Sequence, residues 1–543
     1  MLHVPPKTLI TAICCVFSAL VVKAQSFADT AAAIEKTFAR YRPQNPGAQV
    51  SVSRNGTIIY SHAWGMADLE HNIPLTTENV SEAGSVTKEF TAAAILLLEQ
   101  QGKLSMDDDI RKYLPEIPDY GSVIRIRHLM HHTSGIKDWG YVADIGGWAR
   151  TTRTYRNEDA LEIIARQKTL NNKPGDEYVY SNSGFTILAM IAEKVSGMSL
   201  PDFTKKYIFI PAGMVHTQWR DDFKRIVPGR AMAYAKTTDG YETDMPNEYV
   251  YGHAALLTTT EDLCRWVDFY SSARLGGPAL LKKQITPDTF NNGNPHYYAA
   301  GLRISKKKGY KMISHNGATA SYRASLEFFP ELGLTIAGLS NTPEFDTSSY
   351  DVFNKIEDVF LVKKPAAEKP LPPVIAVETL QAYTGNFRNT KSGEGMQVVL
   401  DAGKLFADKR PLAPLSENSF KLGPELLVFA GKKVLDINDE KDTTVWLPVA
   451  PAEINPQTMK DYSGNYYSAE TLSPLSISVR NDSLMLSLHP YRVYHLLPLY
   501  KDGFAVEGFG AVLYFDRDRK NNITGLKISN ARARNVAFGK VGR

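Results

Sequence analysis

The chain has 543 residues, which allows about three or four domains at roughly 100–200 residues per domain. Hydrophobic residues make up 43% and charged residues 22% of the chain, so wholesale disorder and a fibrous repeat are excluded. The 62 basic and 58 acidic side chains give a formal net charge of +4, which is too balanced to suggest a nucleic-acid-binding protein.

The first 24 residues have the pattern of an export signal. Lys7 supplies a positive charge, residues 9–22 form a nearly continuous apolar run, and residues 22–24 form a small-residue cleavage pattern. The apolar run is shorter than the roughly 20 residues of a membrane-spanning helix, and an uncleaved anchor is the alternative. We expect a periplasmic or secreted protein. Cleavage would leave Cys264 as the one remaining cysteine, without a partner for an internal disulfide.

Helical and β-type patterns alternate from about residue 29 to residue 360. Thr30–Tyr41 has helical spacing, and Glu89–Gln101 predicts a strong helix. Gln49–Arg54 and Thr57–Ala63 predict a strand pair joined by an Asn-Gly turn. Residues 363–374 contain four prolines among charged residues and alanines without periodicity, which is typical of an exposed linker.

Beyond the linker the pattern is β-type throughout, and it repeats. The sequence Leu-x-x-Tyr-Thr-Gly-Asn-Phe at residue 380 returns as Met-x-x-Tyr-Ser-Gly-Asn-Tyr at residue 459. Leu-Ala-Pro-Leu at residue 412 returns as Leu-Leu-Pro-Leu at residue 496. Both matches predict two small antiparallel barrels or sandwiches with a packing, shielding or binding role and no catalytic one. We expect four tyrosines of the second repeat to fill the barrel core: Tyr466, Tyr467, Tyr491 and Tyr494. The alternative is that the repeats use them to bind the cell wall.

These patterns divide the chain into five segments. We expect a signal peptide at 1–24, a catalytic domain at 25–362, a Pro-rich linker at 363–374, a first β repeat at 375–452 and a second at 453–543.

The first candidate site element is Ser85-x-x-Lys88. The three-residue spacing at the start of a helix places the hydroxyl and the ammonium group on one face. The apolar helix that follows would bury Lys88, and a desolvated lysine can lose its proton and activate a serine. A serine N-cap followed by an ordinary helix lysine is the structural alternative.

Two further elements carry polar groups between apolar segments. Tyr180-x-Asn182 follows a Pro-Gly turn and precedes a predicted helix at Phe185–Val195. A tyrosinate beside an ammonium group can act as a general base, and an asparagine both donates and accepts hydrogen bonds. In His315-Asn316-Gly317-Ala318, small residues at a strand edge would let a substrate carbonyl approach the backbone.

Together these elements resemble the serine β-lactamase and penicillin-binding protein superfamily, with S-x-x-K, Y-x-N and H-x-G in that order over about residues 30–360. The resemblance is greatest to class C β-lactamases, D-aminopeptidases and related esterases. It implies an α/β fold of the α+β type, with a five-stranded antiparallel sheet, flanking helices and a helical lobe. It also implies that Ser85 is acylated, that Lys88 and Tyr180 transfer protons, that Asn182 binds substrate and lysine, and that Ser85 and Ala318 supply oxyanion N–H groups.

The departure from this resemblance is His315, where β-lactamases and carboxypeptidases usually carry lysine. Histidine is largely neutral at pH 7, so attraction to a substrate carboxylate would be weak. We therefore expect small peptide, D-amino-acid amide or ester substrates. A literal Lys-Ser-Gly at residue 391 falls in a variable loop of the first β repeat and is discounted.

The sequence thus predicts an exported serine hydrolase, either a D-aminopeptidase-like peptidase or an esterase. A penicillin-binding or β-lactamase-type enzyme and a non-catalytic binding protein on the same fold are the alternatives. His131-His132 lacks acidic partners at ligand spacing and is expected to pack in a loop, so neither a metal nor another cofactor is expected. The oligomeric state stays open.

Overall fold

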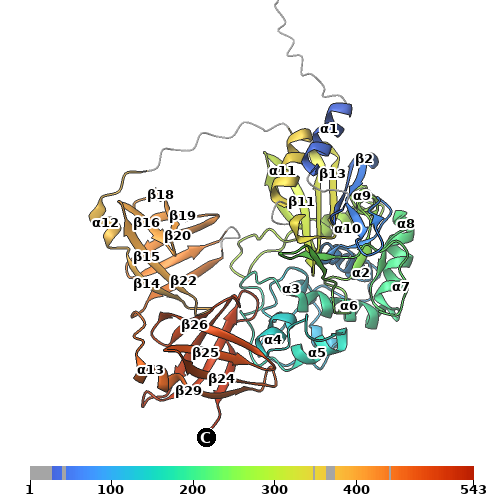
Figure 1. Cartoon of the computed structure of the whole chain (residues 1–543). Coiled ribbons are helices and arrows are strands. Elements are labelled where there is room, and N and C mark those ends of the chain that lie inside the picture. Colours follow the sequence, from blue (N-terminus) through green and yellow to red (C-terminus); the bar gives the residue numbers. More distant parts are fainter. Residues whose placement is uncertain (1–26, 40–43, 346–348, 362–372, 439–441, 543) are drawn as a thin grey trace, which may run out of the picture.

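A computed structural model describes residues 27–39, 44–345, 349–361, 373–438 and 442–542, and Figure 1 shows the whole chain. The predicted export signal at 1–24 and residues 363–372 of the predicted linker lie outside the described residues. No helix in the described ranges is long and apolar enough to cross a membrane.

A six-stranded antiparallel sheet forms the centre of the first domain, in the order β10-β11-β12-β13-β1-β2. Its strands are β1 (Ala48–Arg54), β2 (Thr57–Trp64), β10 (Arg303–Lys307), β11 (Tyr310–Thr319), β12 (Tyr322–Phe329) and β13 (Leu334–Ser340). The predicted β1–β2 hairpin is confirmed. The expectation of five strands was wrong, because β10 pairs along its whole length with β11 and extends the edge.

Side-chain alternation along β1 separates the two faces of this sheet. Val50 and Val52 face a core shared with α1 (Phe27–Phe38) and α11 (Ser349–Phe360), as expected for a half-apolar strand. Ser51 points to the other face, where its hydroxyl lies 2.7 Å from Oγ1 of Thr260, the first residue of α9 (Thr260–Ser271). Figure 1 shows α1 and α11 above the sheet and the larger group of helices below it.

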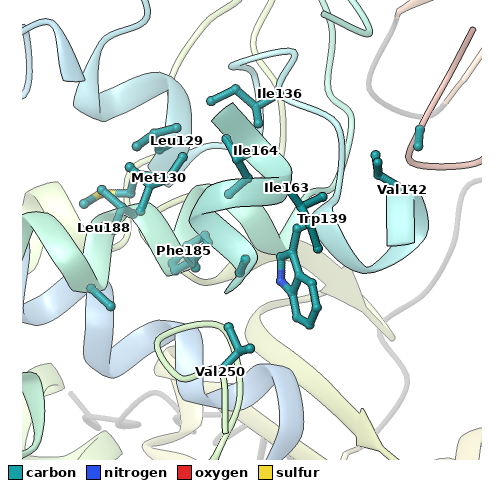
Figure 2. Close-up of a cluster of buried hydrophobic side chains, with 14 of the residues drawn as sticks. Leu129, Met130, Ile136, Trp139, Val142, Ile163, Ile164, Phe185, Leu188 and Val250 are labelled. Atoms are coloured by element: carbon teal, nitrogen blue, oxygen red, sulfur yellow. The ribbon is translucent and has the colours of Figure 1, made fainter. Parts of the chain in front are cut away.

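A lobe made largely of helices lies on the second face, and Figure 2 shows part of its apolar core. This core is continuous with apolar residues of the sheet and of the C-terminal barrel. Trp139, Phe185 and Ile164 are fully buried there and come from three different helices. The helices of the first domain after α1 are α2 (Lys88–Gln100), α3 (Ile126–Met130), α4 (Trp139–Ile145), α5 (Asn157–Ala165), α6 (Asn182–Ser196), α7 (Leu200–Thr204), α8 (Ile210–Ala212), α9 (Thr260–Ser271), α10 (Gly277–Gln284) and α11. Short strands complete the domain: β3 (Met66–Asp68), β4 (Ile73–Pro74), β5 (Ser81–Glu82), β6 (Gln218–Trp219), β7 (Tyr234–Lys236), β8 (Tyr241–Thr243) and β9 (Leu256–Thr258).

The two predicted β repeats form antiparallel structures that each begin with a short helix. In both repeats a helix leads into a strand that begins at the repeated glycine, Gly385 or Gly464. The first repeat is a nine-stranded sheet: α12 (Val377–Gln381), β14 (Gly385–Asn389), β15 (Gly395–Asp401), β16 (Lys404–Ala407), β17 (Arg410–Pro411), β18 (Ala413–Ser416), β19 (Ser419–Leu422), β20 (Glu425–Ala430), β21 (Lys433–Ile437) and β22 (Thr443–Pro448).

The second repeat is a closed eight-stranded barrel. It contains α13 (Pro456–Tyr462), β23 (Gly464–Ser468), β24 (Ser473–Arg480), β25 (Ser483–Leu488), β26 (Arg492–Tyr500), β27 (Gly503–Val506), β28 (Ala511–Arg517), β29 (Ile523–Asn530) and β30 (Val536–Lys540). Tyr466 is fully buried as predicted, and Tyr494 packs against the core. The prediction was wrong for Tyr467 and Tyr491, which are 44% and 92% exposed, because Tyr467 alternates outward on β23 and Tyr491 lies in a turn.

The barrel is docked on the helical lobe, beside α4 in Figure 1. A fully buried ion pair joins Lys137 Nζ to a Glu470 carboxylate oxygen at 2.7 Å. A second pair joins Arg492 of β26 to Asp144 of α4 at 3.0 Å. The barrel is therefore held against the loop and helix that border the candidate site.

Candidate active site

Ser85 lies in a 3-10 turn, Gly84–Thr87, between β5 and α2. The turn leaves Ser85 half-buried at the wall of a cavity, while Lys88 begins α2 and is fully buried. The predicted helix is thus confirmed, and its apolar residues bury the lysine.

Lys88 Nζ contacts three oxygen atoms. Its partners are Ser85 Oγ at 3.1 Å, Asn182 Oδ1 at 2.9 Å and the His253 carbonyl oxygen at 2.8 Å. The structure therefore brings together the first two candidate motifs, and it adds a backbone carbonyl that sequence reasoning did not identify.

Burial lowers the pKa of Lys88 well below its ordinary value, and the positive charge of Arg532 lowers it further. The Asp138 carboxylate opposes this shift only in part. A low dielectric environment disfavours the ammonium form, so the neutral amine is favoured at this position.

Tyr180 lies in the loop just before α6, and Asn182 lies in the helix itself. Asn182 is the first residue of that helix, and its backbone N–H donates to Asp138 Oδ2 at 2.7 Å. The Tyr180 ring packs at a tilt against His132 with ring centres 4.1 Å apart, so His132 packs in a loop as expected. The Tyr180 hydroxyl is buried without reaching hydrogen-bond geometry to any described group.

Burial also raises the pKa of Tyr180 above its ordinary value. The nearby Ser85 hydroxyl and the Arg532 guanidinium lower the pKa of Tyr180 by smaller amounts. Tyr180 is therefore a protonated phenol in the resting site, and the base of the resting pair is Lys88.

The third candidate motif lies on β11 at the edge of the cavity. His315 is buried, with its Nε2 2.9 Å from the Tyr298 hydroxyl and its Nδ1 2.6 Å from the Asn316 carbonyl oxygen. Burial lowers the pKa of His315 to about 3, and the charges of Lys88 and Arg303 contribute to that shift. A neutral ring with its proton on Nδ1 satisfies both contacts, so His315 carries no charge.

Two glycines allow β11 to approach the Ser85 turn closely. A methyl group on Gly317 would lie 2.0 Å from the Ala83 carbonyl oxygen and 3.0 Å from Ser85 N. One on Gly84, whose φ is +50°, would lie 2.6 Å from Ala318 N. The backbone nitrogens of Ser85 and Ala318 thus border one narrow gap, where two N–H groups could bind an oxyanion.

The cavity has a volume of about 660 Å³, and seven predicted residues line it: Ser85, Tyr180, Asn182, His315, Asn316, Gly317 and Ala318. Sequence reasoning missed Arg150, Glu248, Arg303 and Arg532, which also line it. No local motif marks them, since they come from separate loops and strands and Arg532 comes from the barrel.

The discounted Lys391-Ser392-Gly393 does lie in a loop, between β14 and β15. It is not among the cavity residues, but Lys391 Nζ is 3.1 Å from Glu177 on the loop that precedes Tyr180. Among the described residues, Asp68, Glu70 and His71 form a cluster with ligand atoms within 4.8 Å. This cluster does not line the cavity, and its His71–Asp68 contact of 2.7 Å is an ordinary surface ion pair.

The chain is similar to several known proteins. Penicillin-binding protein 4* of Bacillus subtilis (strain 168) is 29% identical over 407 residues, which cover 69% of this chain and 87% of that protein. D-aminopeptidase of Brucella anthropi is 25% identical over 536 residues, which cover 93% of this chain and 98% of that protein. The octameric penicillin-binding protein homologue from Pyrococcus abyssi has a similar fold, with a TM-score of 0.52 and 21% identity over 86% of this chain and 99% of that chain. The profile of the family described as Beta-lactamase matches residues 31–356, and the chain belongs to that family.

Proposed function

We propose that this protein is a serine hydrolase that cleaves amide or ester bonds through an acyl-enzyme on Ser85. The observation that carries the proposal is the buried Lys88 amine, 3.1 Å from Ser85 Oγ. A lysine used only for structure would be paired with a carboxylate, whereas the contacts of Lys88 are a hydroxyl, an amide oxygen and a carbonyl oxygen.

The direction of proton transfer follows from counting hydrogens on Lys88. A neutral amine has two N–H donors and one lone pair. The oxygen atoms of Asn182 and His253 can only accept, so they take both N–H groups. The lone pair is left for the Ser85 hydroxyl, which donates its proton to Lys88 and becomes a nucleophile.

Acylation then follows in two steps. Ser85 Oγ forms a bond to the scissile carbonyl carbon while its proton moves to Lys88, and the backbone N–H groups of Ser85 and Ala318 stabilise the oxyanion. As the tetrahedral intermediate collapses, the bond to the leaving group breaks. The Tyr180 hydroxyl donates a proton to the departing nitrogen or oxygen, and Lys88 returns one to Tyr180.

Deacylation repeats this sequence with water in place of Ser85. Lys88 takes a proton from water, whose oxygen attacks the acyl carbon. The ester bond to Ser85 breaks, and the proton on Lys88 returns to Ser85 Oγ. The products are a carboxylic acid and the free enzyme.

Two substrate classes remain in this proposal. A D-aminopeptidase-like peptidase is supported by the relative from Brucella anthropi, which aligns with this chain over both β repeats. An esterase is supported by the uncharged His315. A penicillin-binding activity is the alternative, favoured by the identity to penicillin-binding protein 4*. We also propose export to the periplasm or medium, on the basis of residues 1–24.

Intact-mass analysis of the purified chain, beside Ser85→Ala, tests the proposal. We expect a fluorophosphonate adduct that depends on Ser85 and no long-lived adduct from a penicillin, because deacylation would hydrolyse the acyl-enzyme. A long-lived penicillin adduct would instead support the penicillin-binding alternative. Absence of both adducts from correctly folded protein would refute the acyl-enzyme and favour a binding protein on the same fold.

A further inference from the structure

The loop between β29 and β30, residues 531–535, carries a cation from the barrel into the candidate active site. The Arg532 carbonyl oxygen accepts hydrogen bonds from Asp138 N at 3.1 Å and from Asn171 Nδ2 at 2.9 Å. Asn530 Oδ1 accepts from Arg532 N and Ala533 N at 3.2 and 2.8 Å. The loop is thus fixed from both sides, and Arg532 is attached to the same Asp138 that holds the start of α6.

The Arg532 side chain lies at the cavity wall between two aromatic rings. Its guanidinium carbon is 4.5 Å from the centre of the Tyr180 ring and 5.2 Å from that of Tyr141. Lys88 Nζ is 4.9 Å from the centre of the same Tyr180 ring, so the guanidinium is only one aromatic ring away from the proposed base. Stacked rings hold the planar group in place and leave its edge of N–H donors available.

Within the described ranges, Arg532 makes no ion pair. Two other cations of the cavity are neutralised: Arg150 contacts Glu248 at 3.2 Å, and Lys307 contacts Glu357 at 3.1 Å. A third, Arg323, donates through Nη1 to the backbone carbonyl oxygens of Ala320 and Tyr322 at 2.7 and 2.8 Å. Arg303 also lacks an ion pair among these residues, but it is exposed on the edge strand β10 and lies over Tyr297. The half-buried Arg532 is therefore the cation that is fixed in place beside the reacting groups without an anion of its own.

We propose that Arg532 binds a carboxylate on the substrate, so that this hydrolase prefers anionic acyl donors. The inference rests on the proposed function of the Ser85 site. The planar fork of a guanidinium binds a carboxylate through two parallel hydrogen bonds, and a site fixed before binding loses little freedom when the ligand arrives. The uncharged His315 leads us to expect weak attraction to a substrate carboxylate, whereas Arg532 would attract one. The positive charge that His315 does not provide in the third motif would thus come from the barrel.

Boronic acids that bind at Ser85 test the proposal without turnover. Ser85 Oγ adds to the boron atom, an O–B bond forms, the hydroxyl proton passes to Lys88, and no bond to boron breaks. The probes are 3- and 4-carboxyphenylboronic acids, each paired with the neutral carboxamide of the same shape. For the isomer that binds better, we expect the wild-type protein to favour the carboxylate by about tenfold to a hundredfold.

Arg532→Gln should abolish this preference, measured as the ratio of carboxylate to carboxamide affinity, because any change that acts through Lys88 affects both probes alike. Arg532→Lys should restore part of the ratio. The control is Arg492→Gln, which removes a guanidinium from the same domain interface outside the cavity and should keep the preference. Thermal unfolding of each variant verifies that the barrel stays folded.

The inference is overturned if the wild-type protein binds both probes equally, or if Arg303→Gln abolishes the preference and Arg532→Gln does not. These outcomes differ from failure of the proposed function itself. In that case neither probe binds and fluorophosphonate leaves Ser85 unlabelled. Binding of the carboxamide probe without a charge preference refutes the role of Arg532 alone.

Discussion

The buried ion pair between Lys137 and Glu470 should govern how firmly the barrel stays docked. Replacing Lys137 with Met removes the charge that faces Glu470, whose carboxylate is 2.7 Å away and only 4% exposed. Removing one partner of a buried pair typically costs about 3–5 kcal/mol, since the remaining charge is left uncompensated. Thr169 Oγ1, 3.0 Å from Lys137 Nζ, also loses its partner. We expect a loss in the lower part of that range, because burial already lowers the pKa of Lys137.

The assay is urea unfolding followed by tryptophan fluorescence, with Glu470→Met and the double variant completing a mutant cycle. In Lys137→Met an unpaired, buried Glu470 should have a raised pKa, so the folded state binds more protons than the unfolded state. The loss of stability should therefore be smaller at pH 5 than at pH 8. The double variant should recover most of the loss, as apolar replacements of buried pairs often do. A loss below about 1 kcal/mol, or a double variant no more stable than the single ones, would refute the reasoning.

Three further predictions concern the site and the central sheet. Lys88→Arg should lower kcat about 100- to 10,000-fold in an aryl-ester assay, since a guanidinium cannot accept the Ser85 proton. In the wild-type protein, kcat/KM should fall as the pH drops through the lowered pKa of Lys88, because the ammonium form cannot act as the base. A wild-type profile with no acid limb over the pH range in which the protein stays folded would contradict this role. Gly317→Ala should abolish fluorophosphonate labelling, because the added carbon would lie 2.0 Å from the Ala83 carbonyl oxygen; labelling at the wild-type rate would show that β11 can retreat. Burial and the nearby Glu357 raise the pKa of Glu327 to about 8, so its contribution to stability is present at low pH and lost as pH rises through 8. Between pH 6 and pH 9 the thermal midpoint of the wild-type protein should fall more than that of Glu327→Gln. An equal fall in both proteins would contradict this prediction.

Local patterns predicted the elements whose determinants are close together in the sequence. The β1–β2 hairpin follows from alternation around an Asn-Gly turn, and α2 follows from an apolar periodicity that buries Lys88. The equivalence of the two β repeats follows from the helix and glycine that begin each of them. The sixth strand, β10, was missed because its exposed, lysine-rich sequence has no apolar alternation, and only pairing with β11 makes it a strand.

In the candidate site too, local sequence predicted the contacts between near neighbours and missed those made by tertiary packing. Ser85 and Lys88 are three residues apart on one turn, so their contact follows from helix geometry alone. The His253 carbonyl and Arg532 reach the site through tertiary packing, and neither has a sequence pattern that distinguishes it from other loop residues. The exposures of Tyr467 and Tyr491 were missed for a related reason: strand register and turn position decide which aromatic faces the barrel core.

The position of Arg532 connects the domain organisation to the chemistry of the site. A cation at the third motif would lie on β11, within the catalytic domain, and would act whether or not the barrel is docked. Arg532 acts only when the barrel is in place, and its charge both lowers the pKa of Lys88 and faces the cavity. The Lys137–Glu470 pair and the Arg532 loop therefore couple barrel docking to the base and to substrate charge. Loss of docking in Lys137→Met should accordingly weaken carboxylate preference before it abolishes labelling of Ser85.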